Sequence, residues 1–165
     1  MPALEAGTVA PPFTLPTTKG EQCSLSKALQ RGWVVAAFFK ITCPVCQLAF
    51  PYLERVHQSY PRDKVTFVGI AQDEEDYTEQ FAREYGVTFP MLLDDTERYP
   101  VSNAYEITNV PTIFVIAPDG EIKLTSIGWD PREIEQLNTL VAEAAGAPRR
   151  PVFSPGEAVP PAKAG

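Results

Sequence analysis

Short apolar runs alternate with amphipathic segments through the middle of this chain of 165 residues. This alternation is typical of strands and helices arranged around a largely parallel sheet. The runs that we interpret as strands are WVVAAFF (33–39), VTFVGIA (65–71), PMLLD (90–94), TIFVIA (112–117) and EIKLTSIG (121–128). The first, second and fourth runs are apolar at nearly every position, which indicates central strands covered on both faces. The sequence therefore predicts an α/β fold.

The segments between these runs predict helices at 43–60, 75–85, 96–105 and 130–145. The second of them is followed by Gly86, where we expect it to stop. The last begins with a capping signature, in which Asp130 is the N-cap, Pro131 the first helical residue and Glu133 an acidic residue in the first turn.

Two hairpins are predicted at the borders of the sheet. APDG (117–120) is a tight turn between the last two strands, so these strands should pair antiparallel and make the sheet mixed. Ahead of the first strand, residues 13–29 should form a small hairpin that turns at Lys19-Gly20, and then a short helix. We expect this hairpin to cover one edge of the sheet.

The length of the chain fits one domain with a sizeable core. Residues 147–165, APRRPVFSPGEAVPPAKAG, are rich in proline and alanine and have too little apolar content to build structure of their own. We therefore divide the chain into a domain at 1–146 and an extended tail at 147–165. Phe153, the one large apolar side chain of the tail, could dock back on the domain.

The chain is acidic, with a net charge of −7 and an isoelectric point near 4.7. Long-range repulsion therefore disfavours nucleic acids and anionic membranes as partners. No stretch reaches the roughly 18 apolar residues of a membrane span. The first residues, MPALEAGTVAPPF, lack the basic and apolar regions of a signal peptide. As written, the sequence predicts a cytoplasmic protein, or a periplasmic or other extracytoplasmic one if a leader was removed.

Cys43 and Cys46 are separated by only Pro44 and Val45 and come just after the strand at 33–39. In α/β sheets, functional groups gather where the strands end. Proline is harmless only in the first turn of a helix, so the helix should begin near Cys43. The free amides and the dipole at a helix start favour a thiolate. We therefore expect Cys43 to be the nucleophile of a redox pair and Cys46, almost one turn further on, to be the resolving thiol.

Other roles for the two cysteines are less well supported. A metal site needs further ligands, and besides carboxylates the chain offers only Cys23 and His57, so we expect no metal. We interpret Cys23 as a packing residue. His57 lies about 20 Å along the helix from Cys43 and is interpreted as a surface residue. A purely structural role would leave the position of two thiols at a helix start unexplained. Lys40, shortly before Cys43, could add positive potential there.

The acidic run QDEEDYTE (72–79) is interpreted as a solvated helix start, because carboxylates there complement the helix dipole. The run lacks the glycine and the spacing of a known calcium-binding loop. Trp33 and Trp129 flank the ends of predicted strands and are interpreted as core residues.

The stretch around Cys43 resembles the active site of the thioredoxin-fold oxidoreductases. Pro51 stands eight residues after Cys43, where that family has a helix-kinking proline. Val110-Pro111-Thr112 precedes the strand TIFVIA as the cis-proline loop of the family does. The cis form of the Val110-Pro111 bond is implied by this resemblance alone, since such bonds are usually trans.

Further features resemble the redoxin branch of that fold, the ResA/TlpA-type thiol-disulfide oxidoreductases and their AhpC/TSA peroxiredoxin relatives. They are the N-terminal hairpin, an extra strand and helix at about 65–95, and the phrases GVTFPMLLDD and YEITNVPTIFVIAPDG. The resemblance covers about residues 7–145. It implies a thioredoxin-like three-layer sandwich, whose mixed central sheet is flanked by helices and carries a hairpin extension and a strand-helix insertion.

The resemblance also implies thiol-disulfide exchange with proteins. Cys43 would attack a disulfide of the partner, and Cys46 would resolve the mixed disulfide. Pro111 would face the disulfide, and the backbone of Val110 would pair with an extended substrate segment. Thr42 stands where thioredoxin-like sites commonly carry tryptophan, and it offers a hydroxyl to the sulfur. The implied partners are protein thiols or disulfides and a dithiol or glutathione-type electron donor, for a monomeric chain without a cofactor.

Two proton acceptors of these relatives are missing. The buried acid of thioredoxin falls where this chain has Ala37, and the glutamate of the ResA type falls where it has Ala49. Without an internal base, Cys46 must lose its proton to water or to the partner. We therefore expect exchange activity that rises steeply from about pH 6 to 8.

Two alternative functions stay open. A peroxiredoxin-like thiol peroxidase would have a threonine three residues before its reactive cysteine and an arginine from a distant strand. Here Cys46 has Cys43 at the threonine position, and Cys43 has Lys40. No arginine lies between Arg98 and Arg132. The second alternative is a binding module that has kept the fold without the chemistry, which would show no defined two-electron midpoint against glutathione.

Overall fold

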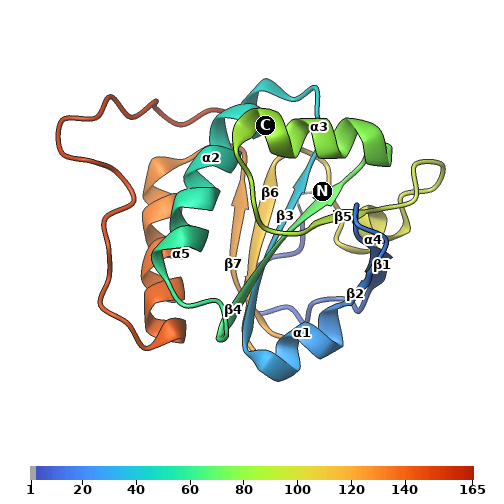
Figure 1. Cartoon of the computed structure of the whole chain (residues 1–165). Helices are drawn as coiled ribbons and strands as arrows, with labels where there is room; N and C mark the ends of the chain where they lie inside the picture. The colour runs from blue at the N-terminus through green and yellow to red at the C-terminus, as the bar shows by residue number, and fades with distance from the viewer. Residues whose placement is uncertain (1–2) are drawn as a thin grey trace.

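A mixed five-stranded sheet lies at the centre of the computed structural model, which describes residues 3–165 (Figure 1). In spatial order its strands are β5 (Met91–Leu93), β4 (Val65–Ala71), β3 (Trp33–Phe39), β6 (Thr112–Ile116) and β7 (Ile122–Ile127). β3 pairs in parallel with β4 and antiparallel with β6, and β6 and β7 form the expected hairpin. The prediction of a mixed sheet is therefore confirmed.

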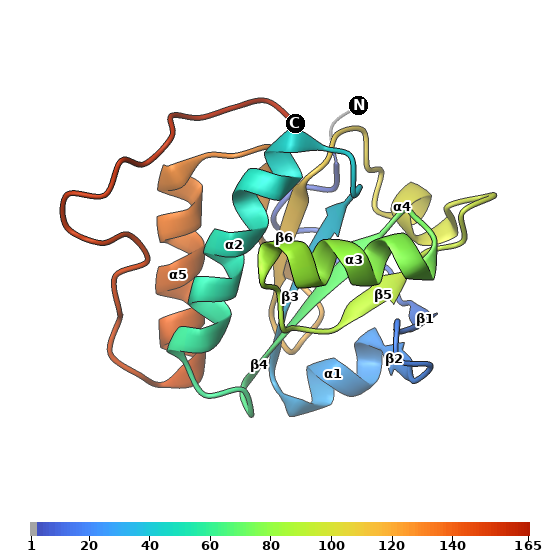
Figure 2. The same cartoon turned by 45° about the horizontal axis from the view of Figure 1, so that its top comes forward.

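The helices cover both faces of this sheet (Figures 1 and 2). They are α1 (Leu25–Arg31), α2 (Pro44–Ser59), α3 (Glu75–Tyr85), α4 (Pro100–Ala104) and α5 (Pro131–Ala145). α2, α3 and α5 share a core with Val35 and Phe39 of β3, whereas α1 and α4 share a core with Val34 and Phe38. The result is the expected three-layer sandwich. None of the helices between residues 3 and 165 has the length and apolarity needed to span a membrane.

The fourth helix is shorter than predicted. The sequence predicted a helix at 96–105, but α4 begins at Pro100. Proline lacks the amide that a helix interior needs and disfavours a helical residue before it. Tyr99 accordingly leaves the helical region, with a φ of 50°, and its amide donates to the carbonyl oxygen of Asp95 at 2.8 Å in the turn that precedes α4.

The N-terminal hairpin consists of β1 (Thr14–Pro16) and β2 (Gln22–Ser24). The amide of Thr18, in its turn, donates to the carbonyl oxygen of Met91 at 3.0 Å. The hairpin therefore covers the β5 edge of the sheet, as expected. Cys23 of β2 is half-buried and packs against the core on the α1 side, in agreement with its interpretation as a packing residue.

The tail at 147–165 contains no helix or strand and returns along α2 and α5 toward the start of α2 (Figures 1 and 2). Phe153 docks on the domain, with its ring centroid 5.4 Å from that of Tyr52 and 6.3 Å from that of Trp129. Trp129 is buried, as its interpretation as a core residue requires. The tail is therefore a packed part of the molecule, although it has no regular structure of its own.

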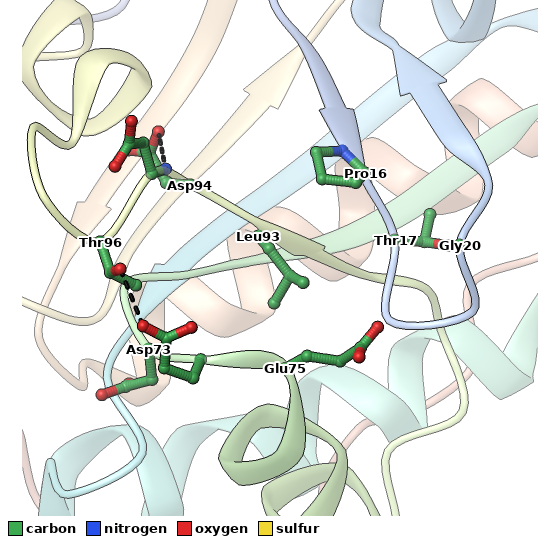
Figure 3. A pocket seen from close by; sticks show the side chains of 10 residues that line it. Pro16, Thr17, Gly20, Asp73, Glu75, Leu93, Asp94 and Thr96 are labelled. Carbon is green, nitrogen blue, oxygen red and sulfur yellow. Dashed lines mark hydrogen bonds between the residues drawn. The ribbon is translucent and has the colours of Figure 1, made fainter.

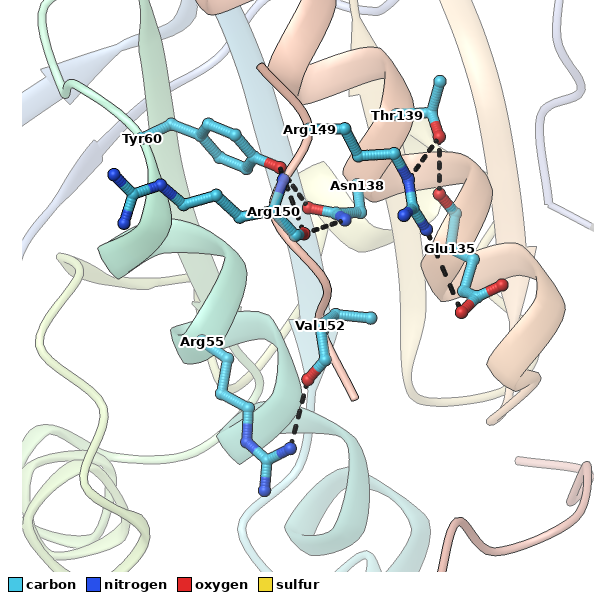
Figure 4. A network of polar contacts seen from close by, with 8 residues as sticks. All are labelled: Arg55, Tyr60, Glu135, Asn138, Thr139, Arg149, Arg150 and Val152. Carbon is cyan, nitrogen blue, oxygen red and sulfur yellow. Dashed lines mark hydrogen bonds and ion pairs between the residues drawn. The ribbon is translucent and has the colours of Figure 1, made fainter. Parts of the chain in front are cut away.

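Polar contacts fasten the first half of the tail (Figure 4). The amide of Arg150 donates to the hydroxyl of Tyr60 at 2.9 Å, and Asn138 donates to the carbonyl oxygen of Arg150 at 2.7 Å. Further along, the guanidinium of Arg55 makes two hydrogen bonds of 2.8 Å to the carboxylate of Glu157. A paired, two-point contact of this kind fixes orientation as well as distance.

Candidate active site

The loop after β3 carries Cys43 to the start of α2. Cys43 is the N-cap of α2, with an extended backbone (φ −82°, ψ 113°), and Pro44 is the first helical residue. The predicted helix start near Cys43 is therefore confirmed. The sulfur of Cys43 accepts a hydrogen bond from the amide of Cys46 at 3.1 Å. One sulfur thus caps the helix by satisfying an amide that has no partner within the helix.

The two thiols of this turn differ in exposure. Cys43 is half-buried, whereas Cys46 is fully buried in the core under α2. Burial raises the pKa of the Cys46 thiol, and its hydrogen bond with Cys43 raises that pKa further. Both cysteines are free thiols. A partner can therefore reach Cys43 but not Cys46, which is expected to hold its proton at neutral pH.

The loop before β6 lies across from Cys43. β6 pairs antiparallel with β3, with Thr112 opposite Phe38, so the beginning of one strand meets the end of the other. The Val110-Pro111 peptide bond is cis. Pro111 is buried and Val110 is half-buried, and the thiol of Cys43 donates to the carbonyl oxygen of Val110 at 3.4 Å. The structure therefore brings Cys43, Cys46, Val110 and Pro111 together.

Lys40 and Thr42 expose their side chains on the loop that leads to Cys43. The carbonyl oxygen of Lys40 accepts a hydrogen bond from the amide of Cys43 at 3.2 Å. A backbone hydrogen bond from Lys40 lowers the pKa of Cys46, against the larger effect of burial. Lys40 therefore acts on the thiols through its backbone. Thr42 lies on the surface that a partner of Cys43 would meet.

Asp73 is a site residue that the sequence interpretation missed. It was read as part of a solvated helix start, but its carboxylate is half-buried and accepts a hydrogen bond from the amide of Ile41 at 2.8 Å. Gln47 donates to the carbonyl oxygen of Ile41 at 2.9 Å, so the loop before Cys43 is held from two sides. The charge of Asp73 also contributes, after larger effects led by burial, to the raised pKa of Cys46. Its position just after β4, the parallel neighbour of β3, is the sequence signal that could have identified it.

His57 is buried, and its interpretation as a surface residue was wrong. Its ring lies between Phe67 and Phe89, with centroids at 5.3 and 5.6 Å, and its Nδ1 has no hydrogen-bond partner among the described residues. Helical spacing explains the burial, because His57 follows Phe50 and Leu53 on the face of α2 that packs on the sheet. Burial lowers the pKa of His57. The residue is more than two turns beyond Cys46 and takes no part in the thiol site.

Asp73 also borders a hollow of about 450 Å³ between the N-terminal hairpin, β5 and the start of α3 (Figure 3). Its other acidic neighbours include Glu75 and Asp94, and Asp94 accepts hydrogen bonds of 2.8 Å from the amide and the hydroxyl of Ser102. The residues that line the hollow include neither a cysteine nor a histidine. We therefore place the candidate active site at the half-buried sulfur of Cys43 and not in this hollow.

This chain is similar in sequence and fold to proteins that are named thiol-disulfide oxidoreductases. The model of the AhpC/TSA family matches residues 6–125. The thiol-disulfide oxidoreductase ResA of Geobacillus kaustophilus is 31% identical over 132 residues, which cover 79% of this chain and 74% of that protein. ResA of Bacillus subtilis is 32% identical over 121 residues, which cover 73% of this chain and 66% of that protein. Among solved structures, the thioredoxin domain of a thiol-disulfide oxidoreductase from Bacteroides vulgatus has a TM-score of 0.75 at 22% identity, and the match covers 84% of this chain and 99% of that one.

Proposed function

This chain belongs to the AhpC/TSA family and is a thioredoxin-like thiol-disulfide oxidoreductase, and we propose that it exchanges electrons with protein disulfides through Cys43 and Cys46. The observation that carries this proposal is the unequal pair at the start of α2. The sulfur of Cys43 is half-buried and accepts a hydrogen bond from the amide of Cys46. The sulfur of Cys46 itself is fully buried. A nucleophile that is only partly buried, with a fully buried second thiol, is the arrangement that two-step exchange requires.

In the reducing direction, the thiolate of Cys43 attacks one sulfur of the partner's disulfide. A bond forms between Cys43 and the partner, the partner's own S–S bond breaks, and its second sulfur leaves as a thiolate. Cys46 then gives its proton to water or to that leaving thiolate and attacks the sulfur of Cys43. The partner departs with both sulfurs reduced, and the Cys43–Cys46 pair has lost two electrons as a disulfide.

The proposed partners follow from the surroundings of Cys43. A substrate segment would lie extended beside Val110, where backbone pairing gives affinity with little dependence on side chains. Pro111 would sit against the reacting sulfurs, and the hydroxyl of Thr42 would face the incoming chain. A dithiol or a glutathione-type donor would return two electrons to the oxidised pair in each cycle.

The test combines a redox titration with trapping. Against glutathione buffers, the wild-type protein should show one two-electron midpoint, which Cys43→Ser and Cys46→Ser each abolish and the matched control Cys23→Ser retains. Cys46→Ser should also accumulate mixed disulfides with protein substrates on Cys43, because the resolving step is lost. Ordinary, independent thiols in the wild-type protein would contradict the proposal. Rapid consumption of hydrogen peroxide at Cys43 would support the peroxidase alternative.

A further inference from the structure

The last residues of the tail return to the thiol site after the tail has run beside α5 (Figures 1 and 2). In both views the C-terminal end of the trace lies next to the start of α2, where Cys43 is located. The tail is led there by contacts along its course, above all the two hydrogen bonds between Arg55 and Glu157. The pKa of Glu157 is lowered to about 2 by its hydrogen bonds with Arg55, so this carboxylate stays charged at any physiological pH.

Beyond this contact, Lys163 of the tail forms an isolated bridge with Trp129, which follows β7. The amide of Trp129 donates to the carbonyl oxygen of Lys163 at 2.8 Å, and the amide of Lys163 donates to the carbonyl oxygen of Trp129 at 2.7 Å, in an antiparallel bridge. The indole of Trp129 donates to the carbonyl oxygen of Pro160 at 2.9 Å. These contacts use the backbone of the tail, which is how an extended peptide adds to a sheet.

After this bridge, the tail reaches the cis-proline loop. Asn109 donates to the carbonyl oxygen of Gly165 at 3.2 Å. Gly165 lies so close to the carbonyl oxygen of Val110 that a Cβ atom on Gly165 would clash with it. Gly128 is equally close to the backbone of Lys163 and leaves no room for a side chain. The carbonyl oxygen of Val110 is therefore contacted by two groups, the thiol of Cys43 and the backbone of Gly165.

We propose that residues 160–165 occupy the surface beside Val110 where the protein substrate would pair, so that this segment must leave before a partner can pair with Val110 and present its disulfide to Cys43. The proposal rests on the proposed function, and it adds an autoinhibitory contact to it. Because the tail is held at Glu157 by Arg55, the segment beyond can swing away while the rest of the tail stays in place. The close backbone contacts of Gly128 and Gly165 leave no room for a side chain at either position, so this surface fits an extended chain with small residues.

Two variants and one matched control test this proposal. Lys163→Pro removes the amide that bonds to Trp129, whereas Lys163→Ala keeps that amide and removes only the ammonium group. Deletion of residues 161–165 removes the bridge with Trp129 but keeps Pro160 and the contact between Arg55 and Glu157. Hydrogen exchange of the Trp129 amide reports docking without any thiol chemistry. We expect it to be slow in the wild-type protein and in Lys163→Ala, and at least about tenfold faster in the other two.

The kinetic readout compares reduction of insulin with reduction of glutathione disulfide. Release of residues 160–165 should raise kcat/KM for insulin by roughly fivefold in Lys163→Pro and in the deletion variant. The value for glutathione disulfide should stay within about twofold, because this small disulfide needs only the sulfur of Cys43 and no pairing with Val110. Rapid exchange of the Trp129 amide in the wild-type protein, or equal insulin reduction by all four proteins, would overturn the proposal while leaving the proposed function intact. If none of the four proteins reduces either disulfide, the proposed function fails and this inference falls with it.

Discussion

The thiol of Cys43 lies 3.4 Å from the carbonyl oxygen of Val110, although 67 positions separate these residues in the sequence. The antiparallel pairing of β3 with β6 creates this proximity, because the residue after one strand comes to lie beside the residue before the other. The candidate nucleophile and the backbone that would receive a substrate chain therefore form one unit. If a partner pairs with Val110 as proposed, its own sulfur would come to lie beside Cys43.

The different exposure of the two thiols predicts selective alkylation. In the reduced native protein, iodoacetamide should label Cys43 at least about tenfold faster than Cys46, because Cys46 is fully buried and holds its proton. Fragmentation mass spectrometry of the shared tryptic peptide distinguishes the two sites. Labelling in urea is the control, since all three cysteines should then react alike. Equal labelling of both residues in the native protein would show that the sheltered position of Cys46 is wrong.

The raised pKa of Cys46 predicts how the resolving step depends on pH. If glutathione is first attached to Cys43, its release requires the thiolate of Cys46, and burial keeps the fraction of that thiolate small at neutral pH. The release rate should therefore rise by about tenfold per pH unit while the pH lies below the pKa. Stopped-flow measurement from pH 6 to 9 tests this. A plateau below about pH 8 would indicate an internal base near Cys46.

Asp73→Asn should move that pH profile toward lower pH. The carboxylate of Asp73 is one of the groups that raise the pKa of Cys46, after burial and the hydrogen bond with Cys43, and the substitution removes its charge. The amide oxygen of asparagine can still accept from the amide of Ile41, so the loop before Cys43 keeps its support. Glu75→Gln is the matched control, because it removes an exposed acid from the same helix start. A shift of equal size in both variants would mean that Asp73 acts only through the net charge of the protein.

Most elements of the fold could be predicted because their apolar pattern is unambiguous. β3 and β4 are apolar at nearly every position, and their predicted bounds, 33–39 and 65–71, agree with the structure. α3 ends where Gly86 adopts the left-handed conformation that glycine tolerates. The helix predicted at 96–105 was too long because its amphipathic pattern continues across Pro100. Proline restricts the backbone of the residue before it, so α4 begins only at Pro100.

The thiol pair was accessible to sequence analysis because its chemistry depends on local spacing, which places Cys43 and Cys46 in one helical turn. Contacts made through the backbone cannot be predicted from residue types in this way. The residue types of the tail do not predict that Lys163 pairs with Trp129, because the two hydrogen bonds join backbone groups. Every residue carries a carbonyl oxygen, and every residue except proline carries an amide donor. Asp73 has a sequence signal in its position just after β4, but its contact with the amide of Ile41 depends on the fold.

His57→Phe should make the protein less sensitive to mild acid. Burial lowers the pKa of His57 in the folded state below the value of 6.5 that it has when exposed. The neutral ring therefore contributes stability above about pH 6.5, and this contribution is lost as the pH falls through the folded-state pKa. Urea unfolding at pH 7 and pH 5 should show a larger loss of stability in the wild-type protein than in the variant. At pH 7 the variant should be more stable by roughly 1 kcal/mol, because phenylalanine fills the space between Phe67 and Phe89 without the unpaired Nδ1.

The control for this substitution is His57→Gln, which keeps a polar group in the same place. Glutamine does not titrate, so the loss of stability between pH 7 and pH 5 should also be smaller in this variant than in the wild-type protein. It should nevertheless be less stable than His57→Phe at both pH values, since a buried amide without partners costs free energy. An equal loss of stability in all three proteins would place the source of the acid sensitivity between pH 7 and pH 5 at a group other than His57.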